Sequence, residues 1–254
     1  MGIKVLSFEL IGFLAIALFA IAILFSSIGH GGASGYIAIF AILGLEPEFI
    51  RPIALILNVV VAGLGTYKFA KAGYINWKAA AILIGVSAPL SFLGGTIHLP
   101  AEIYRPILGS LLLFSALYLI WKNIYEPKLL SNDALKIPLI GSLSAGGTIG
   151  FLSGLTGIGG GVLLSPVLIL FNWANVRQTA GLAVCFVLAN SIAGLAGNLV
   201  TINGLPAFAG VWAFAVLLGA LVGTKLGLKI APIRILVWLL AFVVFIAAVK
   251  FLIL

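Results

Sequence analysis

A short glycine pattern occurs twice in this chain, each time between a long apolar run and a shorter one. The first copy is Gly29-His30-Gly31-Gly32, and the second, 128 positions later, is Gly157-Ile158-Gly159-Gly160, extended by Gly161. Gly95-Thr96 recurs as Gly223-Thr224 at the same offset. Two landmarks at one spacing predict a duplicated unit of about half the 254 residues. Glycine-broken hydrophobic segments at matching positions of two halves are typical of a transporter's substrate site.

The chain has too few charged residues to cover the surface of a water-soluble protein. It is 63% hydrophobic and 8% charged, whereas soluble domains carry roughly 25% charged residues. The runs Leu10 to Phe25 and Ile235 to Val249 contain no charge. These features predict a polytopic membrane protein, with the lipid bilayer as its surroundings.

The scarcity of reactive side chains excludes several classes of site. A single cysteine, Cys185, excludes an internal disulfide, and two histidines without clustered carboxylates do not make a metal site. We therefore expect no metal, no cofactor and no catalytic group. The net charge of +8 comes from basic residues placed singly at segment ends, which indicates loop charge that sets topology and not nucleic-acid binding. All six acids lie at or near the ends of apolar runs, which argues against a carboxylate proton relay or a dedicated cation site: Glu9, Glu46, Glu48, Glu102, Glu126 and Asp133.

The hydrophobic pattern predicts ten helical segments, five in each half. They are 5–28, 33–45, 50–68, 78–97 and 104–121, then 137–156, 162–172, 177–200, 206–227 and 232–253. Residues 1–122 form the first predicted repeat, 123–136 a cytoplasmic connection and 137–254 the second repeat. The segments that follow the glycine patterns are too short to span, because a spanning helix needs ~20 residues. The predicted fold is an all-α membrane protein of two inverted-topology repeats, each with a glycine-broken segment and a half-helix.

The distribution of basic residues predicts the orientation. If the ten segments alternate sides, one side collects ten basic residues and the other collects four, namely Lys4, Arg51, Arg105 and Lys250. The richer side should be cytoplasmic, with both termini outside a cell (inner) membrane. Five segments per half then give the halves opposite orientations. The ten are Lys68, Lys71, Lys78, Lys122, Lys128, Lys136, Arg177, Lys225, Lys229 and Arg234.

Two glycine triplets and two tryptophans carry predictions about packing. Gly146, Gly150 and Gly154 share a helix face at four-residue spacing, as do Gly219, Gly223 and Gly227. Small residues at this spacing let helices approach closely, so both triplets predict tight helix crossings. Trp212 and Trp238 lie deep within their segments and are expected to pack between helices.

The chain resembles the TauE/SafE sulfite-exporter family of membrane permeases over essentially its whole length. The resemblance rests on GHGGASGYIAIFAILGL and GIGGGVLLSPVLILFNW, on the loop from Lys71 to Trp77, and on Gly94-Gly95-Thr96 with Val222-Gly223-Thr224. It implies export or uptake of sulfur-containing anions such as sulfite, thiosulfate or organosulfonates. The first motif reads Gly31-Gly32-Ala33-Ser34 where the second reads Gly159-Gly160-Gly161-Val162, so the two halves need not contribute equally.

The glycine breaks are the candidate anion site. Without a Cβ they can turn sharply and let a substrate approach the backbone, and the half-helices that begin near Ala33 and Val162 would aim their N–H groups at the break. The alternative interpretation is a tight helix crossing at the same glycines. The candidate substrate-binding residues are Gly29, His30, Gly31, Gly32, Ser34, Asn58, Thr156, Gly157, Gly159, Gly160, Gly161 and Asn190.

The polar side chains each carry two interpretations. The amides of Asn58 and Asn190 could donate to an oxyanion or join helices by hydrogen bonds. His30 could donate to the anion or titrate, although Ile158 is its counterpart. Arg51 and Arg177 follow the half-helices and could guard the entrance, or they could extend to the lipid headgroups.

The predicted function is secondary transport of a small sulfur-containing anion by alternating access, without enzymatic activity. An anion channel or a permease for another small anion is the alternative, and a homodimer through a glycine-bearing face is compatible with the sequence. A remote alternative is an intramembrane serine protease, because Gly32-Ala33-Ser34-Gly35 resembles the nucleophile motif of rhomboid proteases. Such an enzyme needs a histidine that reaches Ser34.

Overall fold

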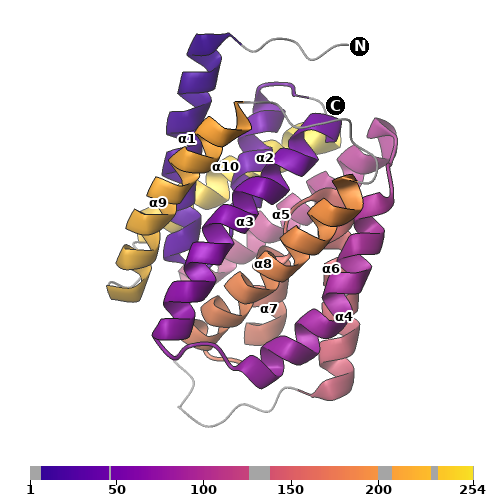
Figure 1. The fold of residues 1–254 in the computed structure, drawn as a ribbon, viewed down its shortest axis with the longest axis vertical. Helices are drawn as coiled ribbons and strands as arrows, with labels where there is room; N and C mark the ends of the chain where they lie inside the picture. Colours follow the sequence, from indigo (N-terminus) through magenta and orange to yellow (C-terminus); the bar gives the residue numbers. More distant parts are fainter. Residues whose placement is uncertain (1–6, 46, 126–137, 200–207, 230–233, 254) are drawn as a thin grey trace.

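The computed structural model describes residues 7–45, 47–125, 138–199, 208–229 and 234–253, and all of their regular structure is helical (Figure 1). The predicted all-α fold is confirmed for this part of the chain. Most of the predicted connection 123–136, and the loop around Asn203, lie outside it. The helices are α1 (Phe8–Ser27), α2 (Ala33–Ile42), α3 (Pro47–Lys71), α4 (Trp77–Thr96), α5 (Ala101–Tyr125), α6 (Leu139–Thr156), α7 (Gly161–Leu170), α8 (Val176–Leu199), α9 (Ala209–Lys229) and α10 (Arg234–Ile253).

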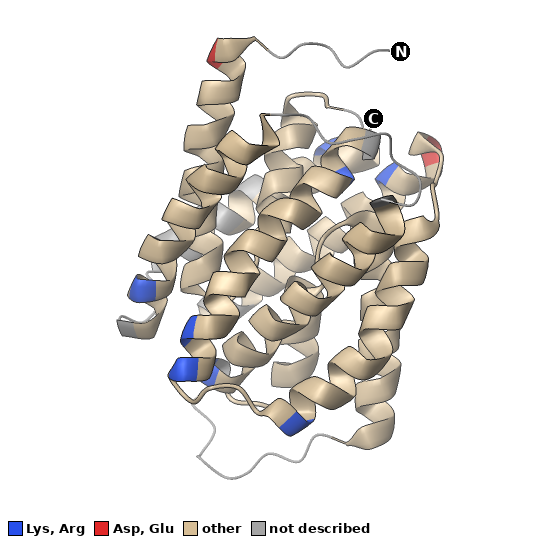
Figure 2. Cartoon of the chain, viewed as in Figure 1, with Lys and Arg blue, Asp and Glu red and all other residues tan. Residues whose placement is uncertain are grey.

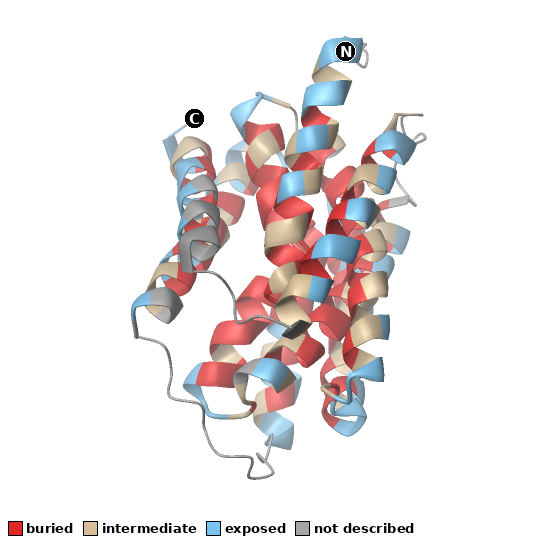
Figure 3. Cartoon of the chain, turned by 90° about the vertical axis from the view of Figure 1, so that its left-hand side faces the viewer, coloured by how far each residue is buried: buried red, intermediate tan, exposed pale blue. Residues whose placement is uncertain are grey.

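Seven of these helices are long and apolar enough to cross a membrane, namely α1, α3, α4, α5, α6, α8 and α9. Large apolar side chains on their outward faces, such as Phe13 and Phe214, are 59% and 62% exposed, and Figure 3 shows exposed residues along the helices on one side of the bundle. Such a surface needs lipid around it. The chain is therefore a multi-pass membrane protein.

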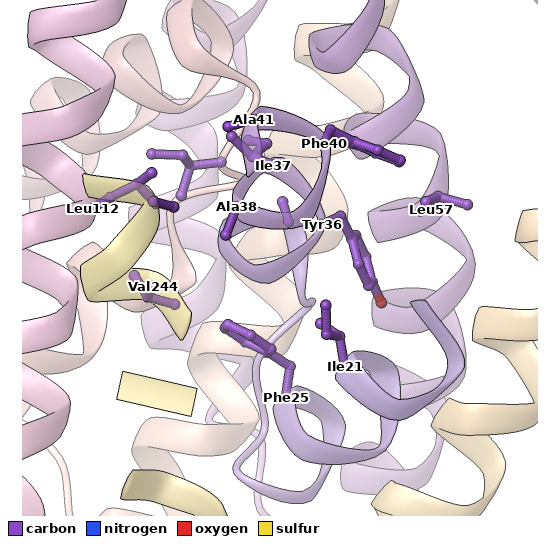
Figure 4. Packing of buried hydrophobic residues seen from close by; sticks show 14 of the residues in the cluster. Ile21, Phe25, Tyr36, Ile37, Ala38, Phe40, Ala41, Leu57, Leu112 and Val244 are labelled. Atoms are coloured by element: carbon purple, nitrogen blue, oxygen red, sulfur yellow. The ribbon is translucent and has the colours of Figure 1, made fainter. Parts of the chain in front are cut away.

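The helices α2 and α7 have 10 residues each, which is about 15 Å at ~1.5 Å per residue. Each is half the length of a spanning helix and follows a glycine break, as the sequence predicts. Both are buried inside the bundle. Figure 4 shows α2 enclosed by apolar side chains from other helices, among them Phe25, Leu57, Leu112 and Val244.

The helices α3 and α8 cross antiparallel to each other in the middle of the bundle (Figure 1). Asn58 of α3 contacts Ser191 of α8, and a Cβ added at Gly65, further along α3, would meet Val184, which comes earlier in α8. Residues of this pair contact both half-helix breaks, because Asn58 bonds Ala33 and Ile158. The pair therefore positions the candidate site.

Both glycine triplets make tight helix crossings, as predicted. Along α6 the three glycines lie against Leu83, Ser87 and Ser91 of α4, and along α9 they lie against Phe19, Ile23 and Ser27 of α1. A Cβ at Gly150 would stand 2.5 Å from the carbonyl oxygen of Ser87, and one at Gly219 would stand 2.5 Å from that of Phe19. In both pairs, residues later in one helix lie against residues later in the other, so the two helices of each pair run parallel.

The two tryptophans behave differently. Trp212 is fully buried, donates its indole N–H to the carbonyl oxygen of Ile11 at 3.1 Å and lies with its ring centre 5.4 Å from that of Phe40. Trp238 is 46% exposed on the outer face of α10, one turn from the exposed Phe242. The prediction that Trp238 packs between helices is wrong, because hydrophobicity alone does not distinguish a lipid-facing side from a helix-facing side.

Charged residues lie at the two ends of the bundle (Figure 2). We call the end at which α1 begins the upper end and the end at which α3 joins α4 the lower end (Figure 1). The last turn of α3 and the first turns of α4 and α8 bring Lys68, Lys71, Lys78 and Arg177 to the lower end. The first turns of α1 and α5 bring Glu9 and Glu102 to the upper end.

Candidate functional site

Each glycine break turns the chain through left-handed backbone conformations before a half-helix begins. In the first break, Gly29 has φ +77° and Gly32, the N-cap of α2, has φ +108°. In the second, Gly157, Gly159 and Gly160 have φ values from +79° to +82°, and Gly160 is the N-cap of α7. Other L-residues rarely adopt these angles. The glycines are therefore required by the turns themselves.

Asn58 joins the two breaks. Its Oδ1 accepts a hydrogen bond of 2.9 Å from the backbone N–H of Ala33, the first residue of α2. Its Nδ2 donates to the carbonyl oxygen of Ile158 in the second break at 3.4 Å, and to the Oγ of Ser191 at 3.3 Å. Asn58 is fully buried. One amide in the middle of α3 thus ties the start of one half-helix to the backbone of the other break.

The central glycines of both breaks approach this amide closely. A Cβ at Gly31 would lie 2.6 Å from Asn58 Oδ1 and 2.5 Å from Val187 Cγ1. A Cβ at Gly159 would overlap Asn58 Nδ2 and lie 3.1 Å from the same Val187 methyl group. We call Gly31, Asn58, Gly159, Val187 and Ser191 the central junction. The structure brings together three of the predicted site residues here.

A second polar contact links the first break to the second half-helix. His30 Nε2 lies 2.9 Å from the Oγ of Ser165, which is four residues into α7, and His30 Nδ1 lies 3.0 Å from the carbonyl oxygen of Ile28. Ser165 Oγ is also 3.0 Å from the carbonyl oxygen of Gly161. His30 is 2% exposed and Ser165 is fully buried.

Arg51 closes the region between the second break and the upper end. Its guanidinium group, on a side chain that is 4% exposed, donates to four backbone carbonyl oxygens at 2.6 to 3.1 Å. These carbonyls belong to the last turns of α4 and α6, where the helix macrodipole is negative. The predicted alternative, an arginine that extends to the lipid headgroups, is wrong for Arg51. The four acceptors are Gly94, Gly95, Ile97 and Gly154.

Tyr104 and Arg51 contact Thr156 and Gly157 at the end of α6. Tyr104 donates its hydroxyl proton to the carbonyl oxygen of Thr156 at 2.8 Å, and the Thr156 hydroxyl donates to the carbonyl oxygen of Leu152 at 2.6 Å. A Cβ at Gly157 would lie 3.0 Å from Arg51 Cγ. Thr156 and Gly157 therefore lie beside Arg51, at the start of the second break.

Arg177 lies at the opposite end of the bundle and is exposed. It donates to the Tyr74 hydroxyl at 3.2 Å, and its guanidinium carbon lies 5.5 Å from the centre of the Tyr74 ring. The two predicted gate residues are thus not brought together. Arg51 lies toward the upper end and Arg177 lies at the lower end.

Asn190 and Ser34 lie in the core with unused hydrogen-bonding capacity. Asn190 donates to the carbonyl oxygen of Phe186 at 2.9 Å, while its Oδ1 has no partner among the described residues. The Oγ of Ser34, in the first turn of α2, has none there either. Both side chains are at most 1% exposed. Buried polar atoms are usually paired, so these two are available to a ligand or to a rearranged state.

A comparison with known families now identifies the chain. The sequence model of the sulfite exporter TauE/SafE family matches residues 14–251. The chain belongs to the TauE/SafE family. It is 41% identical over 219 residues to the probable membrane transporter protein y4hK of Sinorhizobium fredii, covering 86% of this chain and 88% of that protein. No solved structure matches the sequence.

More distant relatives carry the same general description. A probable membrane transporter protein of Methanocaldococcus jannaschii is 27% identical over 245 residues, with 88% of each chain covered. The probable membrane transporter protein YjnA of Bacillus subtilis is 28% identical over 219 residues, covering 80% of this chain and 84% of that protein. This TauE/SafE family member is a membrane transporter.

The geometry of the TauE/SafE chain also bears on the protease alternative. The imidazole nitrogen Nε2 of His30 contacts Ser165, whereas Ser34 Oγ has no partner in the described part of the chain. The base–nucleophile contact that a serine protease needs is thus not made in this structure. Nor do the described residues contain a cluster of three metal-ligating side chains.

Sequence reasoning missed Val187 and Tyr36. Val187 carries no polar group, and only the fold shows that its methyl groups fill the space between Gly31 and Gly159. Tyr36 donates its hydroxyl proton to the carbonyl oxygen of Gly31 at 3.3 Å. Its spacing could have revealed it, because it comes one helical turn after the N-cap Gly32.

Proposed function

We propose that this TauE/SafE protein is a secondary transporter of small sulfur-containing oxyanions or organosulfonates. The observation that carries the proposal is that two half-helices begin at one buried junction, with Asn58 bonded to the first N–H of α2 and to the break before α7. Helix N-termini favour anions through their free N–H groups and the macrodipole. The matching family is described as sulfite exporters.

The charges of the described residues favour an anion. The carboxylates of Glu9 and Glu102 lie in the first turns of α1 and α5 at the upper end. The groups around the central junction are amides, hydroxyls, an imidazole and backbone N–H groups, which can donate to sulfite or sulfonate oxygens. A cation would lack the carboxylate that usually accompanies one inside a membrane.

Alternating access is supported by the way the two halves pack. The parallel pairs α4–α6 and α1–α9 are related by exchange of the two predicted repeats, since α9 is the counterpart of α4 and α1 is the counterpart of α6. The helices α3 and α8 are counterparts of each other, so exchange of the two repeats leaves this antiparallel pair unchanged. This is the pattern expected of inverted repeats that rock about a central site.

The central junction is closed in this conformation, because Asn58, Val187 and Ser191 are at most 1% exposed. A substrate must therefore wait for one end to open. A closed centre between two polar ends fits a carrier better than a permanently open channel. We further propose an inner-membrane location with the lysine-rich lower end cytoplasmic and both termini outside.

The test is flux in liposomes that contain purified protein. Sulfite, thiosulfate, sulfate and sulfoacetate are offered in turn, with taurine as a zwitterion and sodium and potassium as cations. We expect saturable uptake of at least one sulfur anion, accelerated by the same anion inside the liposomes. Fast cation flux, or unsaturable anion currents without this acceleration, would contradict the carrier proposal.

Two glycine variants link the flux to the breaks. Gly31→Val and Gly159→Val should abolish transport, because a branched side chain cannot fit beside Asn58 and resists the left-handed turn at Gly159. Gly85→Val is the matched control, since a Cβ there meets nothing within 4 Å. Normal flux in both break variants would remove the breaks from the substrate path.

A further inference from the structure

A buried hydrogen-bond relay connects His30 in the first break with Ser165 in the second half-helix. The ring nitrogen Nδ1 lies 3.0 Å from the carbonyl oxygen of Ile28, and Nε2 lies 2.9 Å from Ser165 Oγ. A carbonyl oxygen can only accept, so Nδ1 carries a proton and donates it to Ile28. The protonation state of His30 is therefore decided at Nε2.

Ser165 can satisfy Nε2 in either state. Its hydroxyl has one proton and two acceptors within reach, His30 Nε2 at 2.9 Å and the carbonyl oxygen of Gly161 at 3.0 Å. If the ring is neutral, the hydroxyl donates to Nε2. If the ring is protonated, Nε2–H donates to Ser165 Oγ and the hydroxyl turns to the Gly161 carbonyl. The pair of His30 and Ser165 can therefore gain or lose one proton at Nε2 without movement of a heavy atom.

The position of this relay is as informative as its geometry. His30 is next to Gly31 of the central junction, and Ser165 lies one turn inside α7, whose N-terminus faces that junction. The other histidine, His98, is exposed at the upper end, beyond α4. A positive charge on His30 would therefore appear beside the place proposed for the anion.

The titratable groups near His30 belong to the helices that pack on the first break. The described part of α7 has no titratable residue, and the described carboxylates belong to the upper end. On the other helices that pack on the first break, the titratable residues whose side chains the structure describes are Tyr36 on α2, Arg51, Tyr67, Lys68 and Lys71 on α3, Arg177 and Cys185 on α8, and Lys225 on α9.

We propose that His30 is the proton-binding site through which this transporter couples proton and anion movement, with Ser165 as its positioning partner. The inference rests on the proposed anion transport. A proton from water binds to the Nε2 lone pair in the open state, and the anion binds beside the imidazolium. Both cross together, and both leave on the other side. A buried charge without its partner is costly, so the states that carry only one of the two do not cross. Net flux then follows the sum of the anion and proton gradients.

The first experiment measures pH-driven flux in liposomes, with the anion that the wild type transports best. A gradient of about one pH unit should drive about tenfold accumulation of a monovalent anion in a one-to-one symporter. His30→Gln should abolish this accumulation and also slow the exchange of labelled for unlabelled anion, because the state that carries the anion without a proton does not cross. His98→Gln is the matched control and should accumulate like the wild type. Proton-driven accumulation in the His30→Gln variant would overturn the inference.

The second experiment needs no transport and covers the case in which His30→Gln does not fold. Anion is added to wild-type protein in weakly buffered detergent, and a pH dye reports proton uptake. We expect about one proton per anion bound, and uptake should be unchanged in His98→Gln. Anion binding without proton uptake would overturn the inference. Ser165→Ala should shift the pH at which uptake is half-maximal, whereas a merely structural hydroxyl would leave that pH unchanged.

The two proposals fail in different ways. A wild type that moves no sulfur anion contradicts the proposed function. A wild type that moves the anion equally well with and without a pH gradient, and binds it without proton uptake, contradicts the role of His30 alone.

Discussion

The tight approach of two glycines to Asn58 can be tested with alanine, the smallest side chain that has a Cβ. At Gly31 the new Cβ would stand 2.6 Å from Asn58 Oδ1 and 2.5 Å from Val187 Cγ1, although the backbone there is ordinary. At Gly159 it would overlap Asn58 Nδ2 and would also occupy a left-handed position with φ +82°. The two sites therefore separate a steric clash from a clash combined with backbone strain.

Two other glycines complete the comparison. Gly44 has φ +73°, and a Cβ there would meet nothing within 4 Å, so Gly44→Ala carries backbone strain alone. Gly85 lies within α4, also with nothing within 4 Å and without a left-handed φ. Gly85→Ala should stabilise the protein by ~0.5–1 kcal/mol through its better helix propensity.

The magnitudes follow from these two effects. A left-handed alanine costs ~1–2 kcal/mol, and overpacking a tight core costs ~1–3 kcal/mol. The free energy of unfolding should therefore fall by ~1–2 kcal/mol for Gly44→Ala and by ~1–3 kcal/mol for Gly31→Ala. Gly159→Ala combines both effects, so its free energy of unfolding should fall by ~2–5 kcal/mol. Only the two central variants should also lower anion flux, because only they displace Asn58.

The assay is equilibrium unfolding in mixed detergent micelles, together with flux in liposomes. A Val187→Ala background provides the internal check, since it removes a methyl group that both new Cβ atoms would contact. The cost of Gly31→Ala should be smaller in that background, which a double-mutant cycle measures. If Gly31→Ala has the stability and flux of Gly85→Ala, the packing of the central junction described above is wrong.

Three further predictions concern topology, the two asparagines and the Arg51 layer. In a Cys185→Ala background, cysteines at the exposed positions Lys78 and Glu102 should react with impermeant reagents from opposite faces, Lys78 from the cytoplasm; labelling from the same face would contradict the topology. Asn58→Ala should lower the free energy of unfolding by ~1–3 kcal/mol because it leaves the Ala33 N–H unpaired. Asn190→Ala, which removes an Oδ1 without a described partner, should change stability less and anion affinity more. If the two variants change stability equally and affinity equally, this division of roles is wrong. Arg51→Gln should destabilise the protein by ~2 kcal/mol or more, since it frees several buried carbonyl groups, and unchanged unfolding would show that these hydrogen bonds are dispensable.

The helices and the half-helix breaks could be predicted from the sequence because both follow from local chemistry. Apolar runs of spanning length need helical backbone in a membrane, and a run of 10 residues after a glycine pattern cannot span. The glycine triplets at four-residue spacing likewise specify a close crossing without saying which helix lies opposite. That partner is a property of the tertiary fold.

The roles of the polar side chains depended on this tertiary information. Asn58 and Asn190 look equivalent in the sequence, yet Asn58 reaches both breaks, whereas Asn190 donates to the carbonyl oxygen of Phe186 in its own helix. The sequence places Arg51 at an entrance or in the headgroups, and only the fold shows that it binds the ends of two helices whose acceptors lie 43 to 103 positions away in the chain. Ser165 became a partner of His30 only because α7 folds back beside the other half.

The two breaks are closed by different interactions, and this difference favours one end for opening. Above the junction, Gly157 packs on Arg51, whose guanidinium group binds the carbonyl oxygens of α4 and α6. Below it, Gly29 packs on Ala180, a contact between small apolar surfaces. Parting hydrogen-bonded buried groups costs more than parting small apolar ones. We therefore expect the lower end to open more readily. In a Cys185→Ala background, Ala180→Cys should react with an impermeant thiol reagent. Thr156→Cys should react only when Arg51→Gln is also present. Rapid labelling of Thr156→Cys with Arg51 intact would show that the arginine does not hold the upper end closed.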